Sequence, residues 1–407
     1  MEEKKLIPKR RFEEYVDEWK KYHLGERVKF ITGLTYSPND IVNSKGILVI
    51  RSSNIQNNQV VDADNVYVNP KVVNSDKVNK GDIIVVVRNG SRHLIGKNAV
   101  VRKQMANTVI GAFMTGIRTK QYDFVGALLN TKLFKRQITE NLGATINQIT
   151  LGMFWKFSFY FPSEKEQQKI GKFFRVLDER IANQERKIAK VKALKEAYLA
   201  EMFPQEGETV PKRRFKGFKR EWEIKKLGDI AEVIGGGTPS TSNPEFWNGN
   251  INWYSPTEIG KDVYVTESQK KITELGLQNS SATKLPAHKT ILFTSRAGIG
   301  DMAILAEGAT TNQGFQSLVI DNANCVYFIY SMGYKIKKYA LKNASGSTFL
   351  EISGKELAKT PIIVTSLEEQ QKIGAFFKNL DDQIEAEEAK LEKLKQMKEA
   401  YLEEMFV

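Results

Sequence analysis

Apolar side chains follow a helical period in two long segments of the chain. Residues 163–203 and 366–406 contain no proline and are rich in Ala, Glu, Lys and Leu. Their apolar residues recur every three, four or seven positions, which predicts a long amphipathic helix in each segment. Such stripes favour a two-helix coiled coil over two helices that each pack on a separate domain. The predicted contact residues are Leu177, Ile181, Ile188, Val191, Tyr198, Leu380, Ile384, Leu391, Leu394 and Tyr401, and Leu194, Met202, Met397 and Met405 continue the stripes.

The two segments are copies of one sequence. Aligned without gaps, residues 163–203 and 366–406 share 24 of 41 positions, at an offset of 203 residues in a chain of 407. Between the shared anchors the two halves diverge, so each half is a variable block of about 150 residues followed by a shared helix. At the same offset, Pro8–Phe12 matches Pro211–Phe215, Trp19 matches Trp222, Leu24 and Gly25 match Leu227 and Gly228, and Gly143, Thr145 and Ile149 match Gly346, Thr348 and Ile352.

Each variable block mixes strand and helix patterns. Short β-branched runs between Gly, Asn and Pro turns predict strands at 46–50, 82–87, 290–293 and 317–320. Longer apolar patterns predict helices at Phe124–Leu142 and Cys325–Leu341. The expected fold class is α+β, with two mixed α/β domains separated by a long antiparallel two-helix coiled coil and an internal pseudo-twofold repeat. The expected boundaries are 1–162 and 214–365 for the blocks, 163–203 and 366–407 for the helices, and 204–213 for the linker.

The linker predicts the direction of the helices. It is polar, carries Pro204 and Pro211, and reaches about 35 Å at most. The second block must therefore lie near the far end of the first helix, and the second helix can pair with the first only by running back. From Leu177 onward the first helix would span about 40 Å, close to the roughly 34 Å of one turn of B-DNA.

Charge is divided unevenly along the chain. The net charge is +13, and the blocks carry it: residues 1–162 have 25 basic and 14 acidic side chains, and residues 204–365 have 20 and 16. A basic surface indicates a polyanionic partner, most commonly nucleic acid. The two helical segments have opposite net charges, +3 for 163–203 and −5 for 366–407, which favours their pairing with each other.

Composition excludes several classes of protein. The only cysteine is Cys325, so no disulfide can form within the chain, and no apolar run approaches the roughly 20 residues that span a bilayer. The chain begins with Met1 and four charged residues rather than an apolar signal sequence, and these features favour the cytoplasm. His23, His93 and His288 are not spaced as metal ligands, so we expect no metal site.

Polar side chains that can read DNA follow several predicted strands. Arg pairs with guanine, Asn and Gln pair with adenine, and Ser and Thr contact phosphates or base edges. Turn residues of these types often bond only their own backbone, so the set carries more weight than any member. The candidates are Arg51, Ser53, Asn54, Arg88, Asn89 and Arg92 in the first block, and Thr238, Ser240, Tyr254, Ser255, Thr257, Ser295, Arg296, Thr311, Asn312 and Gln313 in the second.

The second block and both helices resemble a known family. Gly235–Ser240, Phe246–Ile251 with Trp253, Thr311–Gly314 and the helical Glu369–Ile373 closely resemble the specificity subunits of type I restriction-modification systems. The order of block, helix, block and helix extends the resemblance over the whole chain. The first block departs from the pattern, because it has Ile31–Thr35 where the second has a triple glycine followed by Thr and Pro.

The resemblance implies a DNA-binding subunit with partners. Each block would be a target-recognition domain that reads one half of a bipartite site in double-stranded DNA. The helices would set the spacer between the halves and dock two methyltransferase subunits, which bind S-adenosylmethionine. A restriction subunit with a motor, using ATP and Mg²⁺, is a further partner that the family implies.

Motifs for catalysis are weak in this chain. Asn243–Phe246 resembles the Asn-Pro-Pro-Phe/Tyr motif of adenine methyltransferases, but Glu245 replaces the second proline and no Gly-rich cofactor loop accompanies it. We therefore expect a non-catalytic subunit that binds no cofactor and no metal itself. A coiled-coil protein–protein adaptor and a self-sufficient DNA methyltransferase remain the alternatives.

Overall fold

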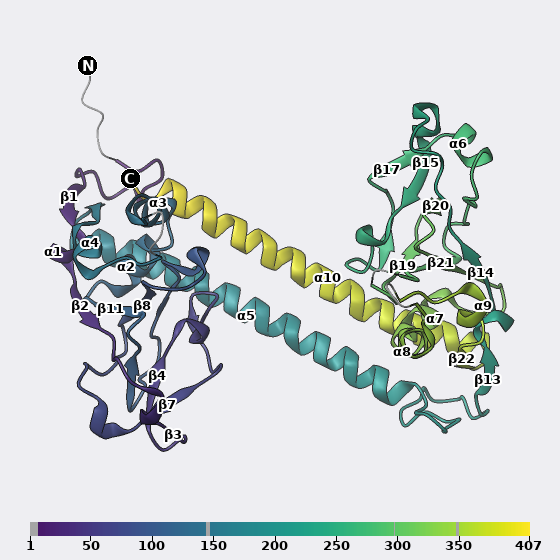
Figure 1. Cartoon of the computed structure of the whole chain (residues 1–407), viewed down its shortest axis with the longest axis horizontal. Coiled ribbons are helices and arrows are strands. Elements are labelled where there is room, and N and C mark those ends of the chain that lie inside the picture. The colour runs from purple at the N-terminus through teal and green to yellow at the C-terminus, as the bar shows by residue number, and fades with distance from the viewer. Residues whose placement is uncertain (1–6, 144–146, 297, 347–349) are drawn as a thin grey trace. The chain divides into compact units, whose positions relative to one another are not determined.

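The computed structural model describes residues 7–143, 147–296, 298–346 and 350–407. It contains two compact units (Figure 1). Unit 1 comprises the chain up to Glu185 together with Ala389–Val407, and unit 2 comprises Arg186–Glu388. Among the positions singled out above, Thr145 and Thr348 lie outside the described residues.

Unit 1 contains two four-stranded sheets, a short antiparallel pair, and a small hairpin of β5 (Ile55–Gln56) and β6 (Gln59–Val60). The first sheet is antiparallel, and in the second the edge strand β10 runs parallel to β4. In order, the first is β2 (Lys29–Thr32), β11 (Met114–Arg118), β8 (Ile83–Val86) and β9 (Asn98–Val100), the second is β10 (Thr108–Ile110), β4 (Ile47–Ile50), β7 (Val66–Val68) and β3 (Ile41–Val42), and the pair is β1 (Lys20–His23) with β12 (Ser158–Phe161).

Unit 2 repeats this plan with small changes at the sheet edges. Its three-stranded sheet again has a parallel edge pair, formed by β15 and β20. The larger sheet is β14 (Ala231–Gly235), β21 (Gln316–Ile320), β18 (Thr290–Phe293), β19 (Met302–Leu305) and β16 (Tyr264–Val265), the smaller is β17 (Lys270–Ile272), β15 (Trp247–Tyr254) and β20 (Ala309–Thr311), and the pair is β13 (Glu223–Lys226) with β22 (Pro361–Val364).

Helices connect and cover these sheets. The two long repeats form α5 (Glu164–Met202) and α10 (Leu367–Glu404). The predicted single helices at 124–142 and 325–341 are wrong, because each is broken into two. Thr131 breaks the first: its hydroxyl donates to Leu128 O at 2.7 Å and caps the next helix by accepting from Phe134 N at 3.3 Å. The resulting helices are α2 (Tyr122–Leu128) and α3 (Lys132–Asn141) in unit 1, α7 (Val326–Ser331) and α8 (Gly333–Asn343) in unit 2, and α4 (Leu151–Lys156) and α9 (Gly354–Leu357) precede β12 and β22.

A buried ion pair joins each block to the start of its helix. In unit 1, Arg11 donates from Nε and Nη2 to both carboxylate oxygens of Glu166, each at 2.8 Å. In unit 2, Arg214 donates to Glu369 at 2.6 and 2.8 Å. The repeated Arg and Glu residues are therefore partners, 155 positions apart in both units.

Within each unit, segments of α5 and α10 run antiparallel. In unit 1, Asp178 pairs with Lys398 at 2.6 Å and Glu185 with Lys395 at 3.0 Å. As the residue numbers rise along α5, the numbers of their ion-pair partners in α10 fall. Unit 2 contains the corresponding pairs Lys187–Glu387 at 2.9 Å, Lys192–Glu388 at 2.6 Å and Lys195–Asp381 at 2.5 Å.

Most of the predicted stripe faces inward. Leu177, Ile188 and Leu380 are buried. Leu194 and Met397 depart from the prediction, since their side chains are 46% and 38% exposed. These two occupy equivalent positions in the repeat, so both helices leave the same stripe position in solvent. The other predicted contact residues are half-buried: Ile181, Val191, Tyr198, Ile384, Leu391, Leu394 and Tyr401.

Candidate nucleic-acid interface

In unit 1, four chain segments at the ends of strands are bonded to one another. Gly111, after β10, donates its backbone N–H to Ile50 O at the end of β4, at 2.9 Å. Val87, at the end of β8, donates to Phe113 O at 3.0 Å. Leu34 N–H completes the set by bonding Ile110 O at 2.7 Å. These backbone bonds bring the turns that carry Arg51 and Arg88 together at one edge of the sheets.

Unit 2 builds the same arrangement from different residues. Asn312 N–H bonds Tyr254 O at 3.0 Å, Ser295 N–H bonds Gly314 O at 2.8 Å, and Gly237 N–H bonds Thr311 O at 2.8 Å. The matching bonds define equivalent positions in the two units. Ser255 stands where unit 1 has Arg51, Gly237 where it has Leu34, and Arg296 where it has Arg88.

One glycine is required at the same place in both units. A Cβ on Gly33 would lie 2.0 Å from Gly111 O, and a Cβ on Gly236 would lie 1.9 Å from Asn312 O. Both distances are far below any real contact, so only glycine allows the two backbones to approach. The first block thus keeps the essential glycine although it lacks the rest of the triple-glycine motif.

Arg88 and Arg296 occupy the same position in the two units. Arg88 is exposed, with its guanidinium 4.9 Å from the centre of the Phe113 ring, and Arg296 is half-buried beside Gly314. Among the described residues, neither guanidinium has a hydrogen bond or an ion pair. Two arginines with free donors at equivalent turns are suited to an anionic ligand.

The other candidates of unit 1 form a small bonded network. Asn89 Nδ2 donates to Ser52 Oγ at 3.1 Å, which joins the turn after β8 to the turn after β4. Arg51 Nη2 bonds Asp64, and Ser53 is half-buried beside it. Arg92 is exposed and donates to Leu142 O at 3.3 Å.

Hydroxyl and amide groups take the same places in unit 2. The Thr238 hydroxyl donates to Gln313 Oε1. Ser255 Oγ lies 3.2 Å from the hydroxyl of exposed Thr257, and Asn312 Oδ1 accepts from Gly314 N at 2.8 Å. Ser240, also exposed, is 2.8 Å from the Ser242 hydroxyl. Unit 2 thus presents neutral polar groups around its one arginine at these turns, whereas unit 1 presents several arginines.

Four of the predicted DNA contacts are buried and cannot touch a ligand in this structure. Asn54, Tyr254, Ser295 and Thr311 are 2%, 1%, 0% and 1% exposed. Tyr254 and Thr311 end strands, whereas Asn54 and Ser295 lie in the turns that follow strands, and strand periodicity does not assign the direction of a side chain at such positions. Burial, with the nearby Glu258 carboxylate as a smaller cause, raises the pKa of the Tyr254 hydroxyl to about 12.

Sequence reasoning missed several residues of these turns. Phe113 is 51% exposed beneath Arg88. Gln148 and Glu351 form backbone bridges with Arg88 and Arg296 and are 203 positions apart. The shared offset of 203 could have identified these two residues from the sequence, since they directly precede the repeated Ile149 and Ile352.

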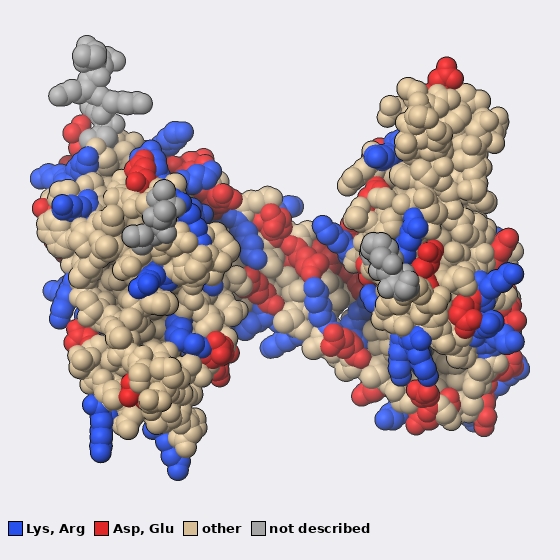
Figure 2. Space-filling model, in the orientation of Figure 1, with Lys and Arg blue, Asp and Glu red and all other residues tan. Residues whose placement is uncertain are grey.

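Basic side chains are spread over the visible face of unit 1 with acidic ones between them (Figure 2). The face shows no single continuous basic patch. The turns, rather than a charged surface as a whole, are therefore the best-defined candidate for recognition.

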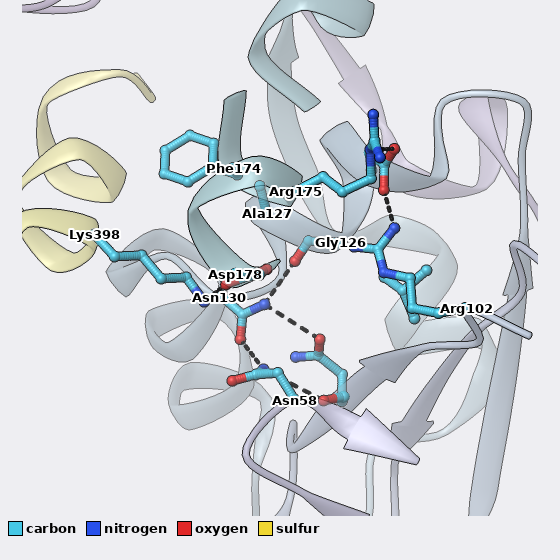
Figure 3. A pocket seen from close by; sticks show the side chains of 12 residues that line it. Asn58, Arg102, Gly126, Ala127, Asn130, Phe174, Arg175, Asp178 and Lys398 are labelled. Carbon is cyan, nitrogen blue, oxygen red and sulfur yellow. Dashed lines mark hydrogen bonds and ion pairs between the residues drawn. The ribbon is translucent and has the colours of Figure 1, made fainter. Parts of the chain in front are cut away.

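A small polar pocket lies apart from these turns, where α2 meets the long helices in unit 1 (Figure 3). Its polar side chains bond one another: Asn58 with Asn130, Arg102 with Asp123, and Asp178 with Lys398. We assign no ligand to it. Across the described ranges, no group of three or more His, Cys, Asp or Glu residues could hold a metal ion, and no helix is long and apolar enough to cross a membrane.

A known protein family matches most of this chain. The family model described as the type I restriction modification DNA specificity domain matches residues 16–193 and again 219–396. The chain belongs to this family. Each match covers one block and most of the helix that follows it, so the chain contains two specificity domains in tandem.

Individual relatives agree with this assignment. The chain is 40% identical over 170 residues to the type I restriction enzyme MjaIX specificity subunit of Methanocaldococcus jannaschii, which covers 41% of this chain and 39% of the relative. It is 35% identical over 176 residues to the EcoR124I/EcoR124II specificity subunit of Escherichia coli, covering 41% and 42%. The alignments thus span about two fifths of each curated relative.

Solved structures share the fold. A type I restriction-modification S subunit from M. genitalium has a TM-score of 0.67 at 16% identity, covering 98% of this chain and 99% of that one. A chain from a study of complex assembly and conformational transition of a type I system has a TM-score of 0.53 at 19% identity, covering 94% and 96%. The mixed α/β two-domain architecture of this chain therefore matches that of solved type I chains.

Proposed function

We propose that the chain reads a bipartite site in double-stranded DNA for a type I restriction-modification complex, with one half-site read by each unit. One observation carries the proposal: both units build the same set of bonded turns, yet line them with different side chains. A contact common to both half-sites requires the same residue in both units, as with Arg88 and Arg296. Discrimination between two different half-sites requires residues that differ, as with Arg51 and Ser255.

In this proposal the chain acts as a non-catalytic scaffold. Two methyltransferase subunits would supply S-adenosylmethionine and the methyl transfer, and a restriction subunit would supply the ATP- and Mg²⁺-dependent motor. The methyltransferase subunits would dock on α5 and α10, and the complex would work in the cytoplasm, where it meets DNA. The proposed recognition domains are residues 1–162 and 214–365.

The long helices would set the distance between the half-sites. We propose that residues 163–203, which contain α5, and residues 366–407, which contain α10, pair as an antiparallel coiled coil. A pseudo-twofold axis would relate the two halves. The ion pairs Asp178–Lys398 and Lys195–Asp381 support this, since Asp178 matches Asp381 and Lys195 matches Lys398 in the repeat. A paired rod of fixed length would hold the two reading sites at one spacing.

Binding measurements test this function against its alternatives. The chain purified with a type I methyltransferase subunit should bind DNA with an affinity that falls steeply with salt, because phosphate contacts release counterions. The chain alone should neither bind S-adenosylmethionine nor methylate DNA. Methylation by the chain alone would favour the self-sufficient methyltransferase, and a salt-independent protein complex without DNA affinity would favour the adaptor.

A further inference from the structure

Arg51 stands at the centre of the unit 1 turns and is held by a carboxylate. Its Nη2 donates to Asp64 Oδ2 at 2.5 Å and to Asp64 O at 2.7 Å. The Arg51 side chain is 33% exposed, and its Nε is buried without a hydrogen-bond partner among the described residues. Both hydrogens of Nη2 are thus donated to Asp64, and among the described residues the donors of the guanidinium left for a ligand are those of Nη1.

The segment that presents Asp64 is itself fixed in place. Asp64 has a φ of 48°, in the left-handed region that side-chain-bearing residues rarely adopt. Buried Asn54 holds this segment by donating to Ala63 O at 2.5 Å and to Asn65 Oδ1 at 2.9 Å. Asn54 Oδ1 also accepts from Arg51 N at 2.9 Å, so one side chain ties the arginine's backbone to the segment that orients its guanidinium.

Unit 2 lacks this device at the equivalent position. Ser255 stands there, and its hydroxyl donates to Glu258 Oε2 at 2.6 Å. Glu258 occupies the place of Asn54, because each bonds the backbone N–H three positions earlier. The oriented arginine is thus a feature of one unit alone, as expected of a residue that distinguishes the two half-sites.

From this geometry, and resting on the proposed function, we propose that Arg51 reads a guanine in the half-site of unit 1 and that Asp64 is its positioning residue. The two N–H donors of Nη1, held in one orientation by Asp64, can bond guanine, which presents two acceptors, O6 and N7, in the major groove. A phosphate contact would not require the orientation that Asp64 imposes, since a mobile cation serves a phosphate equally well.

The test uses the chain in complex with its methyltransferase partner and DNA probes carrying its recognised site. Each guanine of the half-site read by unit 1 is replaced in turn by 7-deazaguanine, which removes the N7 acceptor and preserves base pairing. The wild-type complex should lose affinity roughly ten- to hundredfold at one position. Arg51→Ala should remove this discrimination at that position alone.

Four further variants separate base recognition from charge and from folding. Arg51→Lys keeps the charge but lacks the planar guanidinium that Asp64 orients, so it should also lose the discrimination. Asp64→Ala should weaken the discrimination, and Asp64→Glu should restore part of it. Arg136→Ala, which removes an exposed arginine paired with Glu140, should leave the discrimination unchanged.

Opposite results overturn the inference. Unchanged discrimination in Arg51→Ala, or full discrimination in Arg51→Lys, with the split site still recognised, would overturn the guanine contact alone. A wild-type complex without any sequence preference would overturn the proposed function and this inference together.

Discussion

The aromatic ring of Phe406 stands perpendicular to the indole of Trp19 in the core of unit 1, with ring centroids 6.1 Å apart and an interplanar angle of 90°. Phe203 and Trp222 repeat this contact in unit 2, at 6.0 Å and 89°. In each unit, the last aromatic residue of one long helix completes the core of the block that precedes the other. The repeated Tyr-Leu-x-Glu-Met-Phe ending of the helices is therefore a core-forming element.

Removal of the Phe406 side chain should destabilise unit 1. Phe406 is 6% exposed and also packs on Phe124 and Phe174. We expect Phe406→Ala to cost about 3–5 kcal/mol, the usual range for a buried Phe. Hydrogen exchange measured separately on peptides of each unit would detect faster exchange in unit 1. Phe113→Ala, at an exposed ring, is the matched control, and equal protection in both variants would contradict the packing described here.

The buried ion pair predicts a strong effect from a small change. Glu166→Gln leaves the Arg11 guanidinium buried without its counter-charge, which typically costs about 3–5 kcal/mol when one partner of a buried pair is removed. The exposed pair Arg10–Glu404 is the control, and Arg10→Ala should leave stability nearly unchanged, because solvent screens an exposed pair. Denaturant unfolding, with hydrogen exchange measured on peptides of unit 1 as the readout, distinguishes the two variants. Equal stability of both variants would show that the buried pair is dispensable.

Both partners of this pair were visible in the sequence as repeats, but their contact was not. The match of Arg11 with Arg214 and of Glu166 with Glu369 marks residues kept in both halves. Because the partners lie 155 positions apart, only the tertiary fold shows that they meet. Helical periodicity, which is local, gave α5 and α10 to within two residues at each end.

The candidate site was predictable only in part for a related reason. Tyr254 ends a strand and Ser295 lies just beyond one, and the sequence does not show in which direction such side chains point, so the burial of both was not predicted. The equivalence of Arg88 and Arg296 was also hidden. These arginines are 208 positions apart rather than 203, because loops of different length precede them.

The two equivalent arginines should make matched contributions to DNA binding. Arg88→Ala and Arg296→Ala should each weaken affinity and lower the salt slope by about 1, as the loss of one phosphate contact does. Fluorescence anisotropy over a series of salt concentrations measures both quantities. Arg220→Ala, at an exposed arginine paired with Glu223, serves as the control. A loss confined to one of the two variants would argue against a contact common to both half-sites.

Tyr254 should act in stability rather than in DNA contact. Its hydroxyl is buried without a partner among the described residues, so Tyr254→Phe should leave DNA affinity unchanged and stability equal or slightly higher at neutral pH. The raised pKa of about 12 determines how this hydroxyl changes the stability of the fold at high pH. The folded state keeps this proton longer than the unfolded state, so the wild type should lose more stability than the variant as pH rises from about 10 toward 12.

Unfolding midpoints of the wild type and Tyr254→Phe across this pH interval test the assignment. The two curves should separate above pH 10, with the wild type falling faster. Reduced DNA affinity of a stable Tyr254→Phe variant would return Tyr254 to the reading surface.

Insertions in the long helices test the proposed spacer. Four residues added after Ala189 lengthen α5 by about 6 Å, or roughly one turn. Lys187 and Lys192 pair with Glu387 and Glu388, so a matching insertion in α10 falls after Glu387. The doubly extended chain should recognise a longer unspecified spacer, and the single insertion should lengthen it or abolish assembly. An active complex with the original spacer would contradict the proposal.

The most direct test of two reading units in one chain is single-molecule sequencing of DNA methylated by the chain together with a type I methyltransferase subunit. We expect one split motif: two short specified halves separated by an unspecified gap of fixed length. Exchange of residues 1–162 for the block of another family member should change only one of the halves. A continuous motif, or a block exchange that alters both halves, would contradict the account.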